Sequence, residues 1–132
     1  MMEEWIIHTI VRGLALGTPL IWAALGEVYA ERSGVVNLGV EGMMILGAIA
    51  AFALAQSTGH PYLGLLVAAG AGAAAALLHA FLVISLRANQ YVSGLALAMF
   101  GLGLSALLGR RWEGLPLLTT PPVSPAAPRG VV

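Results

Sequence analysis

Residues 26–48 read Gly-Glu-Val-Tyr-Ala-Glu-Arg-Ser-Gly-Val-Val-Asn-Leu-Gly-Val-Glu-Gly-Met-Met-Ile-Leu-Gly-Ala and separate two apolar parts of the chain. Polar side chains and glycines recur along this stretch, which contains Glu27, Glu31, Arg32, Asn37 and Glu41 together with Gly26, Gly34, Gly39 and Gly42. Glycine-broken, polar backbone at membrane depth is tolerated only where protein or a water-filled path covers it. Charged groups there are costly and usually tied to function. The stretch therefore predicts a covered, functional segment.

The composition around this stretch is that of an integral membrane protein. Of the 132 residues, 59% are hydrophobic and only 9% are charged, whereas a soluble domain carries about 25% charged residues. The formal net charge is zero, which gives no electrostatic reason to expect a nucleic acid partner. Cysteine is absent, so disulfides, thiol nucleophiles and thiolate metal ligands are excluded.

Two further absences bear on energy supply, because the chain contains neither lysine nor aspartate. A phosphate-binding P-loop needs a lysine on the β- and γ-phosphates, and an aspartate usually helps to hold its Mg²⁺. This chain cannot hydrolyse nucleotide by that route, so another chain would have to do so if ATP drives its function.

Four segments are apolar enough to cross a bilayer, which takes about 20 residues of helix, and they cover residues 6–25, 40–56, 62–86 and 91–109. Pro19 predicts a kink in the first span. Turns are expected at residues 56–61 and 87–90. The predicted fold class is all-α and integral to the membrane, with about four transmembrane helices and a polar, re-entrant segment between the first two.

The chain changes character after residue 109. Arg110 and Arg111 precede Trp112, a typical interfacial exit from a membrane. We expect residues 1–113 to form the N-terminal part of a membrane domain and residues 114–132 to form an irregular, proline-rich tail. Arg32 and Arg87 fall on one side of the predicted membrane and the arginine pair on the other, so the positive-inside rule gives no orientation.

Small residues mark several faces of the spans, at Gly13, Gly17, Gly70, Gly72, residues 73–76, Gly94, Gly101 and Gly103. Small residues let helix backbones approach closely in lipid. These faces are expected to meet neighbours, either within this chain or in a partner.

Enzyme interpretations fit poorly. Ser93 is preceded by Val92 and Tyr91 and followed by a glycine, but the glycine that would open a nucleophile elbow is missing. The histidines, His8, His60 and His79, are widely spaced, and no H-E-x-x-H motif occurs. We predict no catalytic residue and no metal site, and interpret His79 as a hydrogen-bonded packing residue within the third span.

The polar stretch has two interpretations. Glu31 and Arg32 are also typical of a solvated loop at the water interface. Asn37 lies between apolar neighbours, and Glu41 lies in the first turn of a hydrophobic span, where the helix dipole favours a carboxylate. The glycine spacing suggests a sharp re-entry of the chain, and broken helices of this kind commonly line transport routes.

Two motifs connect the chain to a family. Residues 31–44, Glu-Arg-Ser-Gly-Val-Val-Asn-Leu-Gly-Val-Glu-Gly-Met-Met, closely resemble permease subunits of bacterial ABC importers. The likeness is strongest to the nucleoside and simple-sugar branch, which is related to ribose and branched-chain amino-acid permeases. Residues 89–97, followed by Gly101 and Gly103, are similar to a second stretch of those proteins. The resemblance covers about residues 14–113.

The resemblance implies a multi-pass pore subunit in the bacterial inner membrane, with no cofactor of its own. Its partners would be a second permease subunit, cytoplasmic ATPase subunits that bind ATP, and a periplasmic or lipoprotein substrate-binding protein. The motifs would place residues 31–41 toward the cytoplasmic half and residues 56–62 outside. They assign the translocation path or its structural motif to Glu31, Arg32, Ser33, Gly34, Asn37, Gly39, Glu41 and Gly42, with a secondary motif at Asn89, Gln90, Ser93 and Gly94.

Family members are roughly twice as long or more, and their ATPase-docking region has no counterpart here. We therefore expect the chain to be a fragment that inserts in the membrane without transporting alone, and we expect the DNA downstream to encode further spans. The rival interpretation is a small helical membrane protein that acts as an assembly or regulatory subunit.

Overall fold

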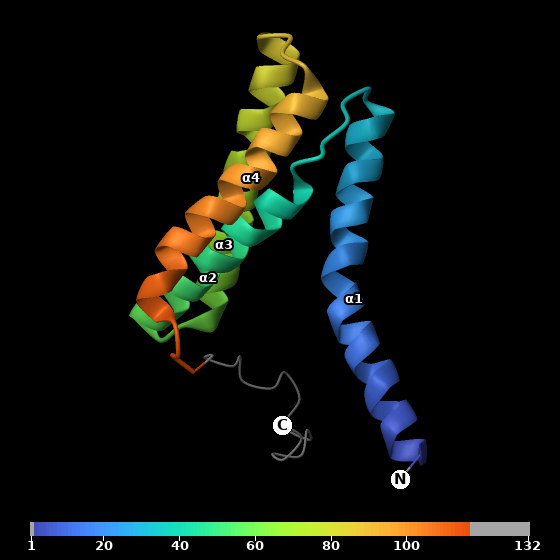
Figure 1. The fold of residues 1–132 in the computed structure, drawn as a ribbon, viewed down its shortest axis with the longest axis vertical. Coiled ribbons are helices and arrows are strands. Elements are labelled where there is room, and N and C mark those ends of the chain that lie inside the picture. The colour runs from blue at the N-terminus through green and yellow to red at the C-terminus, as the bar shows by residue number, and fades with distance from the viewer. Residues whose placement is uncertain (1, 117–132) are drawn as a thin grey trace.

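The computed structural model describes residues 2–116, which form four long helices joined by short connections (Figure 1). The helices are α1 (Met2–Arg32), α2 (Val40–Thr58), α3 (Pro61–Ala80) and α4 (Gln90–Gly109). A short π-helix, Phe81–Ser85, continues α3, and a 3₁₀ turn, Arg110–Trp112, continues α4. All four helical segments are long and apolar enough to cross a membrane. The predicted all-α membrane fold is confirmed, and most of the predicted tail lies outside the described residues.

The first helix is longer than the sequence predicted, so the boundary expected at residue 25 is wrong. Helix α1 runs without interruption through Pro19 and Gly26 to Arg32. A single glycine costs a helix only about 1 kcal/mol, which is less than leaving backbone groups unpaired in lipid. The glycine-broken part of the polar stretch is thereby reduced to residues 33–39, which we call the linker. Figure 1 shows a bend near the middle of α1. Pro19, which has no backbone donor, lies inside this helix.

Helix α2 lies at the centre of a three-helix bundle. It packs against both α3 and α4, which touch each other much less. Helix α1 stands to one side in Figure 1, makes few contacts with the bundle and has no buried residue. The linker and the α3–α4 turn lie at one end of the molecule, and the 3₁₀ turn lies at the other (Figure 1). Arg32 and Arg87 are therefore at the end opposite Arg110 and Arg111, as predicted.

Glycines set the closest approaches within the bundle. A Cβ atom built on Gly101 would lie 2.6 Å from the carbonyl oxygen of Gly42. A Cβ atom on Gly64 would lie 2.7 Å from the carbonyl oxygen of Ala51. Gly101 therefore meets its expected neighbour within the chain itself. Among the glycines predicted to meet neighbours, five have no atom within 4 Å of such a Cβ, and these are Gly13, Gly17, Gly70, Gly72 and Gly103.

Candidate functional site

The linker begins with a left-handed cap on α1. Gly34 has a φ of +87°, a conformation that glycine adopts without a steric penalty. Its N–H donates to the carbonyl of Glu31 at 2.9 Å, and the N–H of Val35 donates to the carbonyl of Ala30 at 3.1 Å. The hydroxyl of Ser33 donates to the same carbonyl of Ala30 at 2.7 Å. This cap satisfies the last carbonyls of α1 and turns the chain toward the bundle.

Consecutive backbone groups of the linker are held by side chains from three different helices. The N–H of Val36 donates to Gln90 Oε1 of α4 at 2.8 Å. The carbonyl of Val36 lies 3.4 Å from His79 Nε2 of α3. The N–H of Asn37 donates to Glu27 Oε1 of α1 at 2.7 Å. Three backbone groups of the non-helical linker are therefore paired with protein side chains, which is the condition for tolerating such backbone at membrane depth.

His79 is the central side chain of this arrangement. It is 3% exposed, and its Nδ1 lies 3.1 Å from the hydroxyl oxygen of Ser93. Because the Val36 carbonyl can only accept, Nε2 is the donor in that contact. The group on Nε2 is a backbone carbonyl, whereas a carboxylate orients the histidine of a Ser-His-Asp triad. The interpretation of His79 as a hydrogen-bonded packing residue agrees with this geometry.

Asn37 shapes the entry into α2. Its Oδ1 accepts from the N–H of Gly39 at 2.9 Å, which closes a local turn. Its Nδ2 lies 3.5 Å from the sulfur of Met43. The linker lies directly on α4 at this point, since a Cβ atom on Gly94 would lie 2.7 Å from the nitrogen of Leu38. The chain therefore runs beside the start of α4 before α2 begins.

The two motifs of the sequence meet here, although 54 residues separate Val36 from Gln90. Gln90, Ser93 and Gly94 all face the linker or the histidine that holds it. Asn89 caps α4, because its Oδ1 accepts from the N–H groups of Tyr91 at 3.0 Å and Val92 at 3.2 Å. The secondary motif is thus the surface on which the linker docks.

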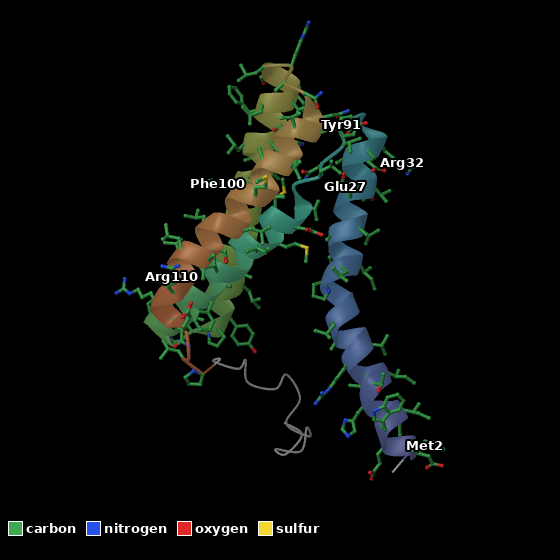
Figure 2. All side chains as sticks on the ribbon, in the orientation of Figure 1. Met2, Glu27, Arg32, Tyr91, Phe100 and Arg110 are labelled. Atoms are coloured by element: carbon green, nitrogen blue, oxygen red, sulfur yellow. The ribbon has the colours of Figure 1, made fainter. Side chains whose placement is uncertain are left out.

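Other predicted residues do not join this cluster through their side chains. Glu31 and Arg32 are exposed in the last turn of α1, and Glu41 is exposed in the first turn of α2. Gly42 lies apart from the linker, against the backbone of Leu97 and Ala98 in α4. Figure 2 shows Glu27 and Arg32 near the linker end of α1 and Met2 at the opposite end.

Sequence reasoning left Glu27 and His79 out of the site. Glu27 was part of the polar stretch but had no assigned role, and His79 was assigned to packing alone. A signal was available, because ionisable residues inside membrane spans are rare and usually paired. Glu27 also has a second carboxylate oxygen, Oε2, that is buried and has no hydrogen-bond partner within residues 2–116.

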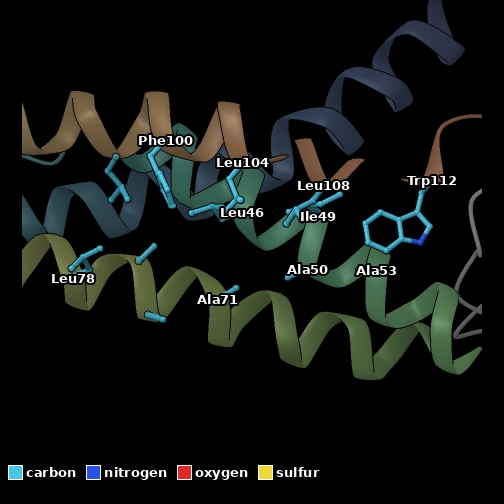
Figure 3. A pocket seen from close by; sticks show the side chains of 13 residues that line it. Leu46, Ile49, Ala50, Ala53, Ala71, Leu78, Phe100, Leu104, Leu108 and Trp112 are labelled. Carbon is cyan, nitrogen blue, oxygen red and sulfur yellow. The ribbon is translucent and has the colours of Figure 1, made fainter. Parts of the chain in front are cut away.

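The hollows of the bundle are apolar. One of about 400 Å³ lies between α3 and α4 and is floored by α2 (Figure 3). A second, of about 500 Å³, continues it toward the α3–α4 connection and shares Leu78, Leu97 and Phe100 with it. His79, Ser93 and Asn89 are the polar residues at that end. The described part of the chain contains no cluster of three or more histidine, cysteine or acidic residues that could hold a metal.

Membrane-length helices and a polar linker held among them define a multi-pass helical membrane protein. The chain matches the family described as branched-chain amino acid transport system / permease component over residues 9–128. It therefore belongs to this family of transporter permeases.

Three relatives are similar to this chain. A putative glucose ABC transporter permease protein of Haloferax volcanii is 46% identical over 79% of the chain and 33% of the relative. A guanosine ABC transporter permease protein of Bacillus subtilis is 48% identical over 68% of the chain and 30% of the relative. A nucleoside ABC transporter permease protein of Lactococcus lactis is 37% identical over 72% of the chain and 32% of the relative. The chain spans about a third of the length of these relatives. No solved structure matches it.

Proposed function

We propose that this chain is part of the membrane-spanning subunit of an ATP-driven importer for nucleosides or simple sugars. Membership of the permease family supports transport. The three relatives, which are named as glucose, guanosine and nucleoside permeases, support the substrate class. The chain would supply part of the wall of the translocation path.

The observation that carries this proposal is the linker held by α1, α3 and α4. Non-helical backbone inside a membrane occurs where protein or a water-filled cavity covers it, and transporters place their binding sites at such breaks. Asn37, Gly39 and Gly42 would shape this part of the path. Glu31, Arg32, Ser33, Gly34 and Glu41 would border it. Asn89, Gln90, Ser93 and Gly94 would hold it in place.

The chemistry of the chain supports a division of labour with partners. Lysine and aspartate are absent, so cytoplasmic ATPase subunits would bind and hydrolyse ATP, and this chain would not be an enzyme. A second permease subunit would complete the path, and a periplasmic or lipoprotein binding protein would deliver the substrate. The location would be the inner membrane of a bacterium. Residues 1–113 would be the N-terminal part of the permease domain, followed by a proline-rich stretch at 114–132.

The mechanism would be alternating access, in which ATP hydrolysis in the partners moves packed helices relative to one another. The linker joins α1, α3 and α4 through its own backbone groups. A displacement of the start of α4 would therefore reach α1 through Val36 and Asn37.

Reconstitution tests the proposal. The complete permease, its ATPase and its binding protein are placed in proteoliposomes, and uptake of radiolabelled guanosine and glucose is measured with and without ATP. We expect ATP-dependent uptake of one of them from the complete system and none from the 132 residues with the same partners. The proposal would be contradicted if the proteoliposomes accumulated the labelled compounds equally well without ATP. It would also be contradicted if an assembled complex took up neither compound. Uptake that the short chain modulates but does not mediate would favour the regulatory alternative.

A further inference from the structure

Glu27 uses only one of its two carboxylate oxygens. Oε1 accepts from the N–H of Asn37 at 2.7 Å, whereas Oε2 is buried without a partner in the described part of the chain. The residue belongs to α1, which is long and apolar enough to cross a membrane. An unpaired buried oxygen loses its hydration without compensation, and the loss is larger when the group is charged. The structure therefore leaves an acceptor that needs a donor.

Asn37, whose backbone N–H donates to Glu27, has the opposite deficit in its side chain. Its Oδ1 is used by the N–H of Gly39 at 2.9 Å. Its amide nitrogen lies 3.5 Å from the sulfur of Met43, and a thioether is a weak acceptor. Glu27 and the residue whose backbone it holds thus offer one free strong acceptor and one poorly used donor.

We propose that Glu27 and Asn37 bind a hydroxyl group of the transported molecule. The hydroxyl donates its proton to Glu27 Oε2 and accepts from Asn37 Nδ2, so both deficits are met by one group that is donor and acceptor at once. The ligand class is a neutral, hydroxyl-rich ring such as a sugar or the ribose of a nucleoside. This inference rests on the proposed function and names the chemistry by which that path recognises its substrate.

Access to the pair depends on α1. Glu27 Oε2 is covered in this conformation, so a ligand reaches it only when α1 moves away from the linker. Helix α1 has no buried residue that would hold it against the bundle. The proposal therefore requires that the hydrogen bond between Glu27 and the Asn37 backbone open during the transport cycle.

Two substitutions of Glu27 distinguish the roles of its two carboxylate oxygens. Glu27→Gln keeps an acceptor for the Asn37 N–H and replaces the other oxygen by a donating amide, whereas Glu27→Leu removes both acceptors. We expect uptake at subsaturating guanosine or glucose, whichever the complete wild-type system transports, to fall about tenfold or more in Glu27→Gln. Glu4→Gln, an exposed position near the start of the same helix, is the matched control and leaves uptake unchanged.

An exchanged pair gives the sharper test. Asn37→Asp keeps Oδ1 for the turn with Gly39 but turns the amide donor into an acceptor, and alone it is expected to reduce uptake. In Glu27→Gln/Asn37→Asp the donor and the acceptor change places and the total charge is restored. A hydroxyl can reverse its own bonds, so the double variant recovers much of the uptake that each single variant loses. A donor fixed on another protein helix cannot reverse, and failure of the double variant to exceed either single variant would overturn the proposal.

Substrate analogues distinguish a ligand hydroxyl from a bound water. The monodeoxy analogues of the transported compound are compared in wild type and Glu27→Gln, with each complex assembled to the same level. For one analogue, the loss caused by Glu27→Gln disappears, because the hydroxyl that the carboxylate would bind is missing. Equal losses for every analogue would mean that water or protein fills the site, and wild-type uptake in Glu27→Gln would mean that Oε2 has no role. Either result overturns this inference while the wild-type uptake still supports the proposed function.

Discussion

Gly101 of α4 lies against the backbone of Gly42 of α2, so closely that a Cβ atom on Gly101 would be 2.7 Å from the Cα atom of Gly42. The contact is reciprocal, because a Cβ atom on Gly42 would lie 2.5 Å from the carbonyl oxygen of Leu97. The first turn of α2 is thereby seated on the middle of α4 by the absence of two side chains. The linker ends immediately before this point, so the crossing also fixes where the linker enters the bundle.

The first prediction concerns this crossing. Gly101→Ala places a methyl group against backbone that cannot rotate away, and overpacking of this kind costs about 1–3 kcal/mol. We expect a clear fall in the thermal unfolding midpoint of the purified protein in detergent. Gly103→Ala is the control, because nothing lies within 4 Å of its Cβ position. Equal midpoints for the two variants would show that the helices do not cross as closely as described.

The second prediction concerns His79. His79→Leu leaves the Val36 carbonyl and the Ser93 hydroxyl without their partner, and an unpaired buried group costs about 1–3 kcal/mol. Ser93→Ala removes one hydrogen bond between helices, which averages only about 0.6 kcal/mol in a membrane. The His79 variant should therefore lose more stability in denaturant titrations than the Ser93 variant.

The double variant tests the same pair directly. Because His79 and Ser93 contact each other at 3.1 Å, the combined loss should be smaller than the sum of the single losses. Strict additivity would mean that this hydrogen bond does not contribute to stability.

The third prediction concerns the linker and the start of α2. Asn37→Leu removes the side-chain acceptor for Gly39, and Glu41→Leu removes a carboxylate at the α2 N-terminus. We expect either change, made in the full-length permease, to abolish uptake and leave membrane insertion intact. Uptake and the amount of protein in washed membranes are measured together, with Glu3→Leu in the exposed first turn of α1 as the control. Wild-type uptake in both variants would contradict the proposal that Asn37 and Glu41 contribute to the translocation path.

The fourth prediction concerns energy coupling. The chain lacks lysine and aspartate, which the P-loop route to nucleotide hydrolysis needs. Purified alone, it should release phosphate from ATP no faster than a preparation from cells with an empty vector. Hydrolysis above that background, retained through a second purification step, would refute the division of labour proposed above.

Hydropathy and turn residues were sufficient to predict most of the fold. The second, third and fourth spans were predicted within a few residues, because each is bounded by a polar or proline-containing turn. The first was predicted too short because Gly26 and Glu27 resemble a boundary. In the structure the helix continues, and the carboxylate of Glu27 is used by the linker instead of by water.

The site was only partly predictable. The motif residues were identified by resemblance, but their pairing depends on Val36, an apolar residue whose contribution is its backbone N–H and carbonyl. Side-chain patterns carry no information about such groups. Ser93 and Gln90 could be singled out from the sequence. That Gln90 binds Val36 directly, and that Ser93 contacts the histidine that binds it, emerges only when α3 and α4 are packed on α2.

The way the linker is held changes how this segment should respond to heavy water. The amide hydrogens of Val36 and Asn37 are bonded to Gln90 and Glu27, although neither residue belongs to a helix. Amides in ordinary loops exchange rapidly, whereas these can exchange only when the contacts with α4 and α1 open. The amide exchange rate at Val36 would report the separation of the linker from α4, and the amide exchange rate at Asn37 would report the separation of the linker from α1. The exchange rates of two neighbouring amides would thus report on the opening of two different helix contacts.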